Sequence, residues 1–109
     1  YTPFLIELKK NIIIDEENEK VKKILKELSC YYCMPATGGY GSSGVPDIIV
    51  SYRGKFIGIE CKANGGKPTA LQKKHLADIK NSLGQSLLID ESNVDMLDCL
   101  ILSGESNIW

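Results

Sequence analysis

Apolar residues recur every three to four positions in two segments of the chain, which predicts two amphipathic helices. In residues 15–28, acidic side chains precede lysines and one apolar stripe comprises Val21, Ile24, Leu25 and Leu28. In residues 69–83, Thr69 and Gln72 have capping-box spacing, Gly84 ends the pattern, and the expected apolar face comprises Leu71, Leu76, Ile79 and Leu83. A weaker helical period covers residues 93–101.

Shorter apolar runs at residues 31–34, 48–50, 56–59 and 86–89 predict strands. Arg53-Gly54 is a turn signal between the second and third runs. A two-residue loop there pairs Val50 with Ile57 and places Asp47 opposite Glu60. The last run follows a helix, so it is a candidate parallel partner. The order helix, strand, strand, strand, helix, strand predicts an α/β fold with one mixed sheet flanked by helices.

Length and composition predict a single globular domain over residues 1–109. The 109 residues are 43% hydrophobic and 25% charged, and neither a membrane-length apolar run nor a signal peptide is visible. Four cysteines without a secretory signature favour free thiols in a reducing cytoplasm. Cys30 and Cys33 have half of a zinc-site spacing, but no second close pair follows, so zinc is not favoured.

Charge is distributed unevenly along the chain. The net charge of −1 argues against coating nucleic acid by bulk attraction, but residues 53–80 hold seven basic and two acidic side chains, a local balance of +5. This segment suits a phosphate-rich substrate, although a solvated lysine-rich helix face explains it equally well. Candidate DNA contacts are Lys67, Lys73 and Lys74. The glycine-rich residues 36–44, including Ser43, form either a plain connector or a lip that brings backbone amides to phosphates.

Asp47 and Glu60 are the candidate chemical groups, with Lys62 on the same face as Glu60 because strand side chains alternate. Opposed carboxylates repel unless positive charge lies between them. Their hard oxygens suit Mg²⁺ or Mn²⁺, and a metal there would serve phosphate chemistry. The alternative is a polar strand face in contact with solvent.

The motif residues resemble a known family. Pro46-Asp47, followed by Glu60-Cys61-Lys62, looks like the PD-(D/E)xK nuclease signature. Gly44-Val45 before that motif, and Gln72 after it, make the chain resemble the VRR-Nuc branch, the virus-type replication-repair nucleases, over about Asp15 to Ile89. This resemblance implies a restriction-endonuclease-like core with the order α-β-β-β-α-β.

The resemblance also implies roles for individual residues. Asp47, Glu60 and the backbone carbonyl of Cys61 would bind Mg²⁺ or Mn²⁺, and Lys62 would act on the nucleophilic water. The Cys61 thiol would face away from the site.

Two further catalytic candidates come from the helices. Gln72 would act near the metal or phosphate, although the capping box alone also explains a glutamine there. Related folds carry an acidic residue early in the first helix, for which Glu17 is the choice and Glu16 and Glu19 are the alternatives.

The function implied is a metal-dependent, structure-specific endodeoxyribonuclease. Standalone members of this size resemble phage enzymes, which would work in the host-cell cytoplasm, and Holliday-junction resolvases, which cut branched DNA as homodimers. Residues 1–14 or 93–109 are candidate dimer interfaces. A flap- or restriction-type nuclease of the same fold, and a DNA-binding module that does not cut, are the alternatives.

Overall fold

The structure is a computed structural model that describes residues 18–35 and 44–109. A helix over residues 18–27 comes first. It is followed by β1 (Tyr31–Cys33), β2 (Ile48–Tyr52), β3 (Lys55–Cys61), α2 (Ala70–Asn81), β4 (Gln85–Ile89), the short 3₁₀ helix η1 (Val94–Met96) and α3 (Leu97–Ser103). The predicted order is confirmed, and the weak helical period becomes η1 and α3. The predictions for residues 1–14, Glu17 and Ser43 lie outside the described residues.

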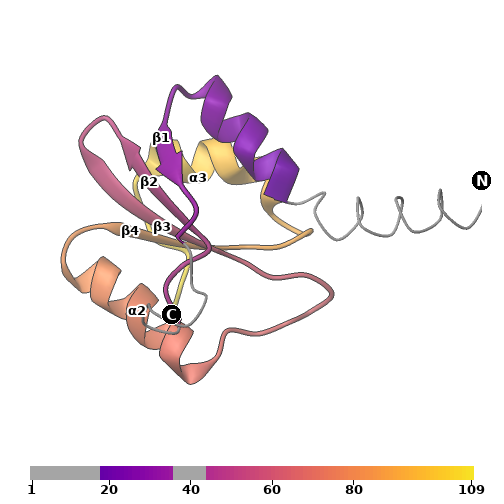
Figure 1. Cartoon of the computed structure of the whole chain (residues 1–109), viewed down its shortest axis with the longest axis vertical. Coiled ribbons are helices and arrows are strands. Elements are labelled where there is room, and N and C mark those ends of the chain that lie inside the picture. The colour runs from indigo at the N-terminus through magenta and orange to yellow at the C-terminus, as the bar shows by residue number, and fades with distance from the viewer. Residues whose placement is uncertain (1–17, 36–43) are drawn as a thin grey trace, which may run out of the picture.

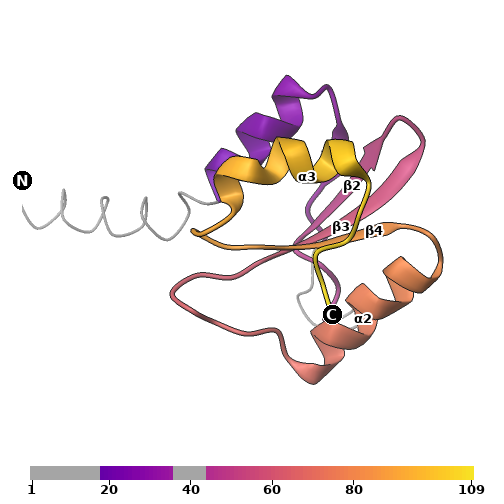
Figure 2. The ribbon, with the colours of Figure 1, turned by 180° about the vertical axis from the view of Figure 1, so that it is seen from behind.

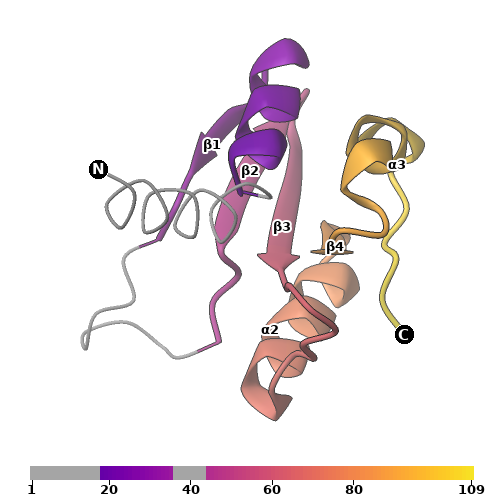
Figure 3. The ribbon, with the colours of Figure 1, turned by 90° about the vertical axis from the view of Figure 1, so that its right-hand side faces the viewer.

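One four-stranded sheet, in the order β1-β2-β3-β4, organises the chain (Figure 3). The first three strands are antiparallel, and β3 and β4 are parallel, as the crossover predicts. Val50 pairs with Ile57, so the predicted hairpin register is correct. Arg53 and Gly54 both have positive φ, 50° and 81°, as a type I′ turn requires. Continued by one residue beyond β2, this register sets Asp47 opposite Glu60.

Helices cover both faces of the sheet, so the mixed α/β architecture is confirmed. The helix over 18–27 and α3 lie on one side of the strands and α2 lies on the other (Figures 1 and 2). The main core is on the first side, where strand and helix residues bury their apolar groups together: Val21, Leu25, Ile48, Val50, Ile57, Ile59, Leu87, Ile89, Val94, Leu97 and Ile101. No helix in residues 18–35 and 44–109 has the length and apolarity to cross a membrane.

The predicted apolar face of α2 is only partly correct. Leu76 is fully buried, and its carbonyl accepts a 2.6 Å hydrogen bond from the Ser86 hydroxyl. Leu71 and Leu83, however, are 42% and 89% exposed. The helix packs on β4 and, to a smaller extent, on β3. Leu83 lies past the end of α2 at a φ of 73°, where the chain turns away.

Close packing around two glycines sets the position of Asp47. Gly44 has a φ of 88°, and a Cβ there would lie 2.8 Å from the carbonyl carbon of Leu71. A Cβ at Gly58 would lie 3.1 Å from Pro46 Cγ. Both contacts are possible only without a side chain, so the chain entering β2 is held between α2 and β3.

Gly44→Ala is expected to destabilise the protein by about 1–3 kcal/mol, because it adds both backbone strain and a clash with α2. Gly54→Ala is the matched control: its φ is 81°, but no atom lies within 4 Å of the added Cβ. Urea unfolding of the two variants measures the difference. Equal losses would show that the contact with α2 contributes nothing.

Candidate active site

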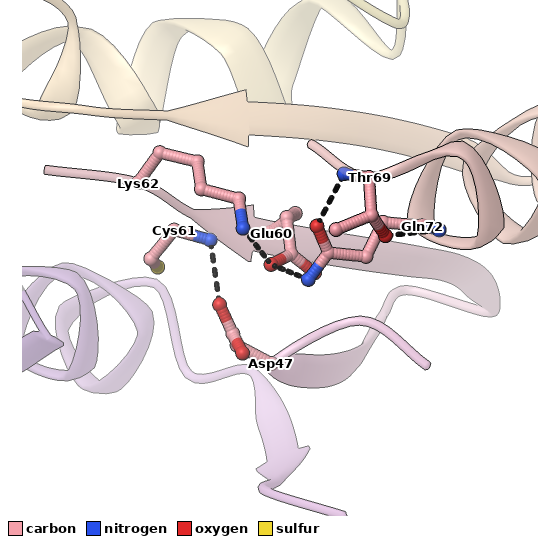
Figure 4. Close-up of polar contacts among 6 residues, drawn as sticks. All are labelled: Asp47, Glu60, Cys61, Lys62, Thr69 and Gln72. Carbon is pink, nitrogen blue, oxygen red and sulfur yellow. Dashed lines mark hydrogen bonds and ion pairs between the residues drawn. The ribbon is translucent and has the colours of Figure 1, made fainter. Parts of the chain in front are cut away.

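The two candidate carboxylates meet at the end of the hairpin (Figure 4). Glu60, near the end of β3, is only 1% exposed. Asp47 directly precedes β2 and is exposed, and its Oδ2 accepts a 2.8 Å hydrogen bond from the Cys61 N–H. The backbone of β3 therefore holds the Asp47 side chain toward β3, next to Glu60.

Glu60 has partners on one of its two oxygens. Its Oε2 accepts a 3.0 Å hydrogen bond from Gln72 Nε2 and lies 3.4 Å from Lys62 Nζ. Its Oε1 is buried and has no hydrogen-bond partner among the described residues. The pKa of Glu60 is raised to about 7, first by burial and then by the nearby Asp47 carboxylate, while Lys62 opposes the rise.

Gln72 serves the helix cap and the carboxylate together. Its backbone N–H donates to Thr69 Oγ1 at 3.2 Å, and its side-chain oxygen accepts from the Thr69 N–H at 2.8 Å. The capping box thus fixes which end of the amide faces Thr69, and the NH₂ group points to Glu60 (Figure 4). The two explanations for this glutamine are therefore compatible.

The donors present fit a divalent cation. Among residues 18–35 and 44–109, no three His, Cys, Asp or Glu side chains gather into a metal-binding group. The available set is Asp47, Glu60 and the Cys61 carbonyl. The N–H and C=O of a strand residue point to the same side, so this carbonyl faces Asp47 along with the Cys61 N–H. The buried Glu60 Oε1 beside a second carboxylate is what a cation would satisfy.

The Cys61 side chain packs against the main core, on the face opposite Glu60, as strand alternation predicts. The other candidate metal ligands of the sequence, Cys30 and Cys33, are both free thiols. Burial raises the pKa of the Cys30 thiol, which disfavours the thiolate that zinc requires.

The remaining sequence candidates lie farther out or outside the described residues. Lys67, Lys73 and Lys74 are exposed, and Lys74 forms a 3.0 Å ion pair with Asp78. Glu17 and Ser43 lie outside the described residues, so their placement stays a prediction. Glu19, an alternative to Glu17, is exposed and pairs with Lys22 at 3.3 Å.

The sequence did not predict the contact between Trp109 and α2. Trp109 lies over Lys73, with 5.4 Å between the ammonium and the ring centroid. The sequence offers no signal for this contact, because it joins the last residue to a helix 36 positions earlier.

Comparison with known proteins supports the fold. A solved structure described as a VRR_NUC domain matches with a TM-score of 0.64 and 21% sequence identity, covering 75% of this chain and 89% of that one. No protein-family model and no curated protein matches the sequence. The chain therefore has the fold of the solved structure described as a VRR_NUC domain.

The raised pKa of Glu60 predicts a pH-dependent loss of stability in metal-free buffer. The unfolded carboxyl ionises near 4.5 and the folded one near 7, so stability falls as pH rises between these values and is level above them. Glu60→Gln lacks this decline, so its stability relative to wild type should rise by on the order of 2–3 kcal/mol from about pH 5 to about pH 8.

Urea unfolding with a chelator present measures this difference. Glu105→Gln, at an exposed carboxylate, is the control and should follow the wild-type profile. Parallel profiles for wild type and Glu60→Gln would show that Glu60 does not titrate as its burial requires.

Proposed function

We propose that this protein is a metal-dependent endonuclease that hydrolyses phosphodiester bonds in DNA. The observation that carries the proposal is the buried Glu60, which faces Asp47 across the hairpin, leaves Oε1 without a partner among the described residues, and has Lys62 at 3.4 Å. Two carboxylates and one lysine at the end of a sheet suit phosphate chemistry better than structural support. The likeness of the fold to a VRR_NUC domain agrees with it.

Asp47, Glu60 and the Cys61 carbonyl would hold Mg²⁺ or Mn²⁺. When bound, the cation supplies a Lewis acid that polarises a phosphoryl oxygen and acidifies water. Gln72 and the Cys61 N–H orient the two carboxylates. Lys62, whose side chain is 20% exposed, can reach both the buried carboxylate and a bound phosphate.

In the proposed reaction, a water oxygen bonds to phosphorus and the bond from phosphorus to the leaving oxygen breaks. One strand end keeps the phosphate and the other becomes a hydroxyl. Lys62 orients the attacking water and stabilises the negative charge that develops on the phosphate. Glu17 is proposed as a further acid of the site. The basic segment 53–80 would attract the DNA backbone, with Lys67, Lys73 and Lys74 as its proposed contacts, and Ser43 in the glycine-rich residues 36–44 is a further proposed contact.

Asp47→Ala and Lys62→Ala are each expected to lower cleavage at least about 100-fold, because they remove a metal ligand and the charge beside the phosphate. Nicking of a labelled DNA with Mg²⁺ or Mn²⁺ measures the rate, and a chelator should abolish it. DNA binding should be largely retained. Lys26→Ala, at an exposed lysine on the helix over 18–27 and outside the basic segment, is the control and should cut normally. Normal cutting by both site variants would refute the assignment.

We further propose a branched DNA substrate and a homodimer. A domain of 109 residues offers a small DNA footprint, and two sites related by a two-fold axis could cut both strands of a junction. The expected interface at 93–109 is partly used within the chain, because Leu97 and Ile101 are buried in its own core. The exposed Met96 and Leu102 remain available to a partner.

On a four-way junction with Mg²⁺ or Mn²⁺, the wild-type protein is expected to make paired, symmetric nicks, since a two-fold dimer presents its sites symmetrically. Mapping of the cleavage positions on each strand measures this, with linear duplex of the same sequence as control. Cutting confined to flaps or to linear duplex would reject the junction proposal while leaving the nuclease proposal intact.

A further inference from the structure

The C-terminal segment, residues 105–109, runs along the outer edge of β4 (Figure 2). Ser106 Oγ accepts a 2.9 Å hydrogen bond from the Ser86 N–H. The Asn107 side chain bonds both backbone groups of Leu88, at 2.8 and 3.0 Å. These bonds occupy groups that an edge strand would otherwise leave open. Leu88 pairs in register with Glu60. The bonds of Asn107 to Leu88 therefore place the C-terminal segment at the same position along the strands as the candidate active site.

Trp109 comes two residues later and reaches the first turns of α2. Its ring centroid is 5.4 Å from Lys73 Nζ, and Lys73 directly follows Gln72, whose amide contacts Glu60. Trp109 as a residue is nevertheless 58% exposed. A large aromatic side chain normally buries most of its surface. Here the segment anchored at Asn107 leaves the Trp109 side chain exposed, with the Lys73 ammonium over its ring.

We propose that Trp109 stacks on an unpaired base of the DNA substrate, with Lys73 beside it for the adjacent phosphate. An indole ring stacks favourably on any DNA base, and lysines near such a stacking surface attract the phosphate backbone of the DNA. In a duplex, neighbouring bases cover both faces of each base, so the proposal selects DNA with an unpaired nucleotide close to the cut. It rests on the proposed nuclease function, and among its candidate substrates it favours branched DNA with an unpaired nucleotide over a fully paired four-way junction.

The single tryptophan of the sequence gives a direct readout. Wild-type protein is titrated, in a chelator that prevents cutting, with a blunt duplex and with the same duplex carrying a short thymidine overhang. The overhang is expected to quench the tryptophan fluorescence and to bind at least about fivefold more tightly than the blunt end.

Trp109→Ala should lose this preference, and Trp109→Phe should keep most of it. These two variants contain no tryptophan, so their binding is measured by the fluorescence anisotropy of labelled DNA. Tyr31→Ala is the matched control, because Tyr31 is an aromatic side chain, 74% exposed, on the opposite edge strand. Its preference should equal that of wild type.

Unchanged fluorescence on binding the overhang, or an unchanged preference in Trp109→Ala, would overturn the stacking proposal. Cleavage of the same two DNAs by wild-type protein with Mn²⁺ separates this failure from that of the function. Cutting without a role for Trp109 refutes only the stacking, whereas stacking by a protein that cuts neither these two DNAs nor the four-way junction refutes the nuclease.

Discussion

The burial of the Glu60 carboxylate is the constraint on which the rest of the site depends. A carboxylate at 1% exposure loses most of its hydration, and the cost is large unless hydrogen bonds or opposite charge replace it. Gln72 and Lys62 replace it on one oxygen only, and Asp47 adds like charge nearby. The apparent pKa of about 7 expresses this imbalance. The protein therefore keeps, at the end of β3, a group that is stabilised incompletely by its own chain.

Several local features of the fold keep Asp47 and Glu60 in their positions. The type I′ turn at Arg53-Gly54 fixes the hairpin register, and a slip of one residue would move Glu60 to the opposite face of the sheet. The capping box at Thr69 begins α2 and at the same time directs the Gln72 amide. Gly44 allows close contact with α2 just before Asp47. Helix capping, strand register and glycine packing thus act together on one pair of carboxylates.

The sequence predicted the parts that depend on local chemistry. The turn residues determined the hairpin register, and strand alternation then put Glu60 and Lys62 on one face and the Cys61 side chain on the other. Prediction from the sequence failed where long-range packing determines whether a side chain is buried and where it lies. Leu71 and Leu83 match the helical period but remain exposed, and Leu83 lies past the end of α2. The position of Trp109 depends on Asn107 recognising the edge of β4, which no local pattern encodes.

The same energetics separate a functional site from a structural ion pair. A buried Glu–Lys pair kept only for stability would have all its oxygens bonded, and apolar replacements often stabilise such pairs. Here Glu60 Oε1 has no hydrogen-bond partner among the described residues. The neighbouring Asp47 adds a negative charge, which an uncharged side chain at that position would not. Proteins retain such local losses of stability mainly where a ligand recovers them. At 21% identity the fold likeness supplies no chemistry, and the unsatisfied Glu60 carboxylate is the feature that favours a cation at this site.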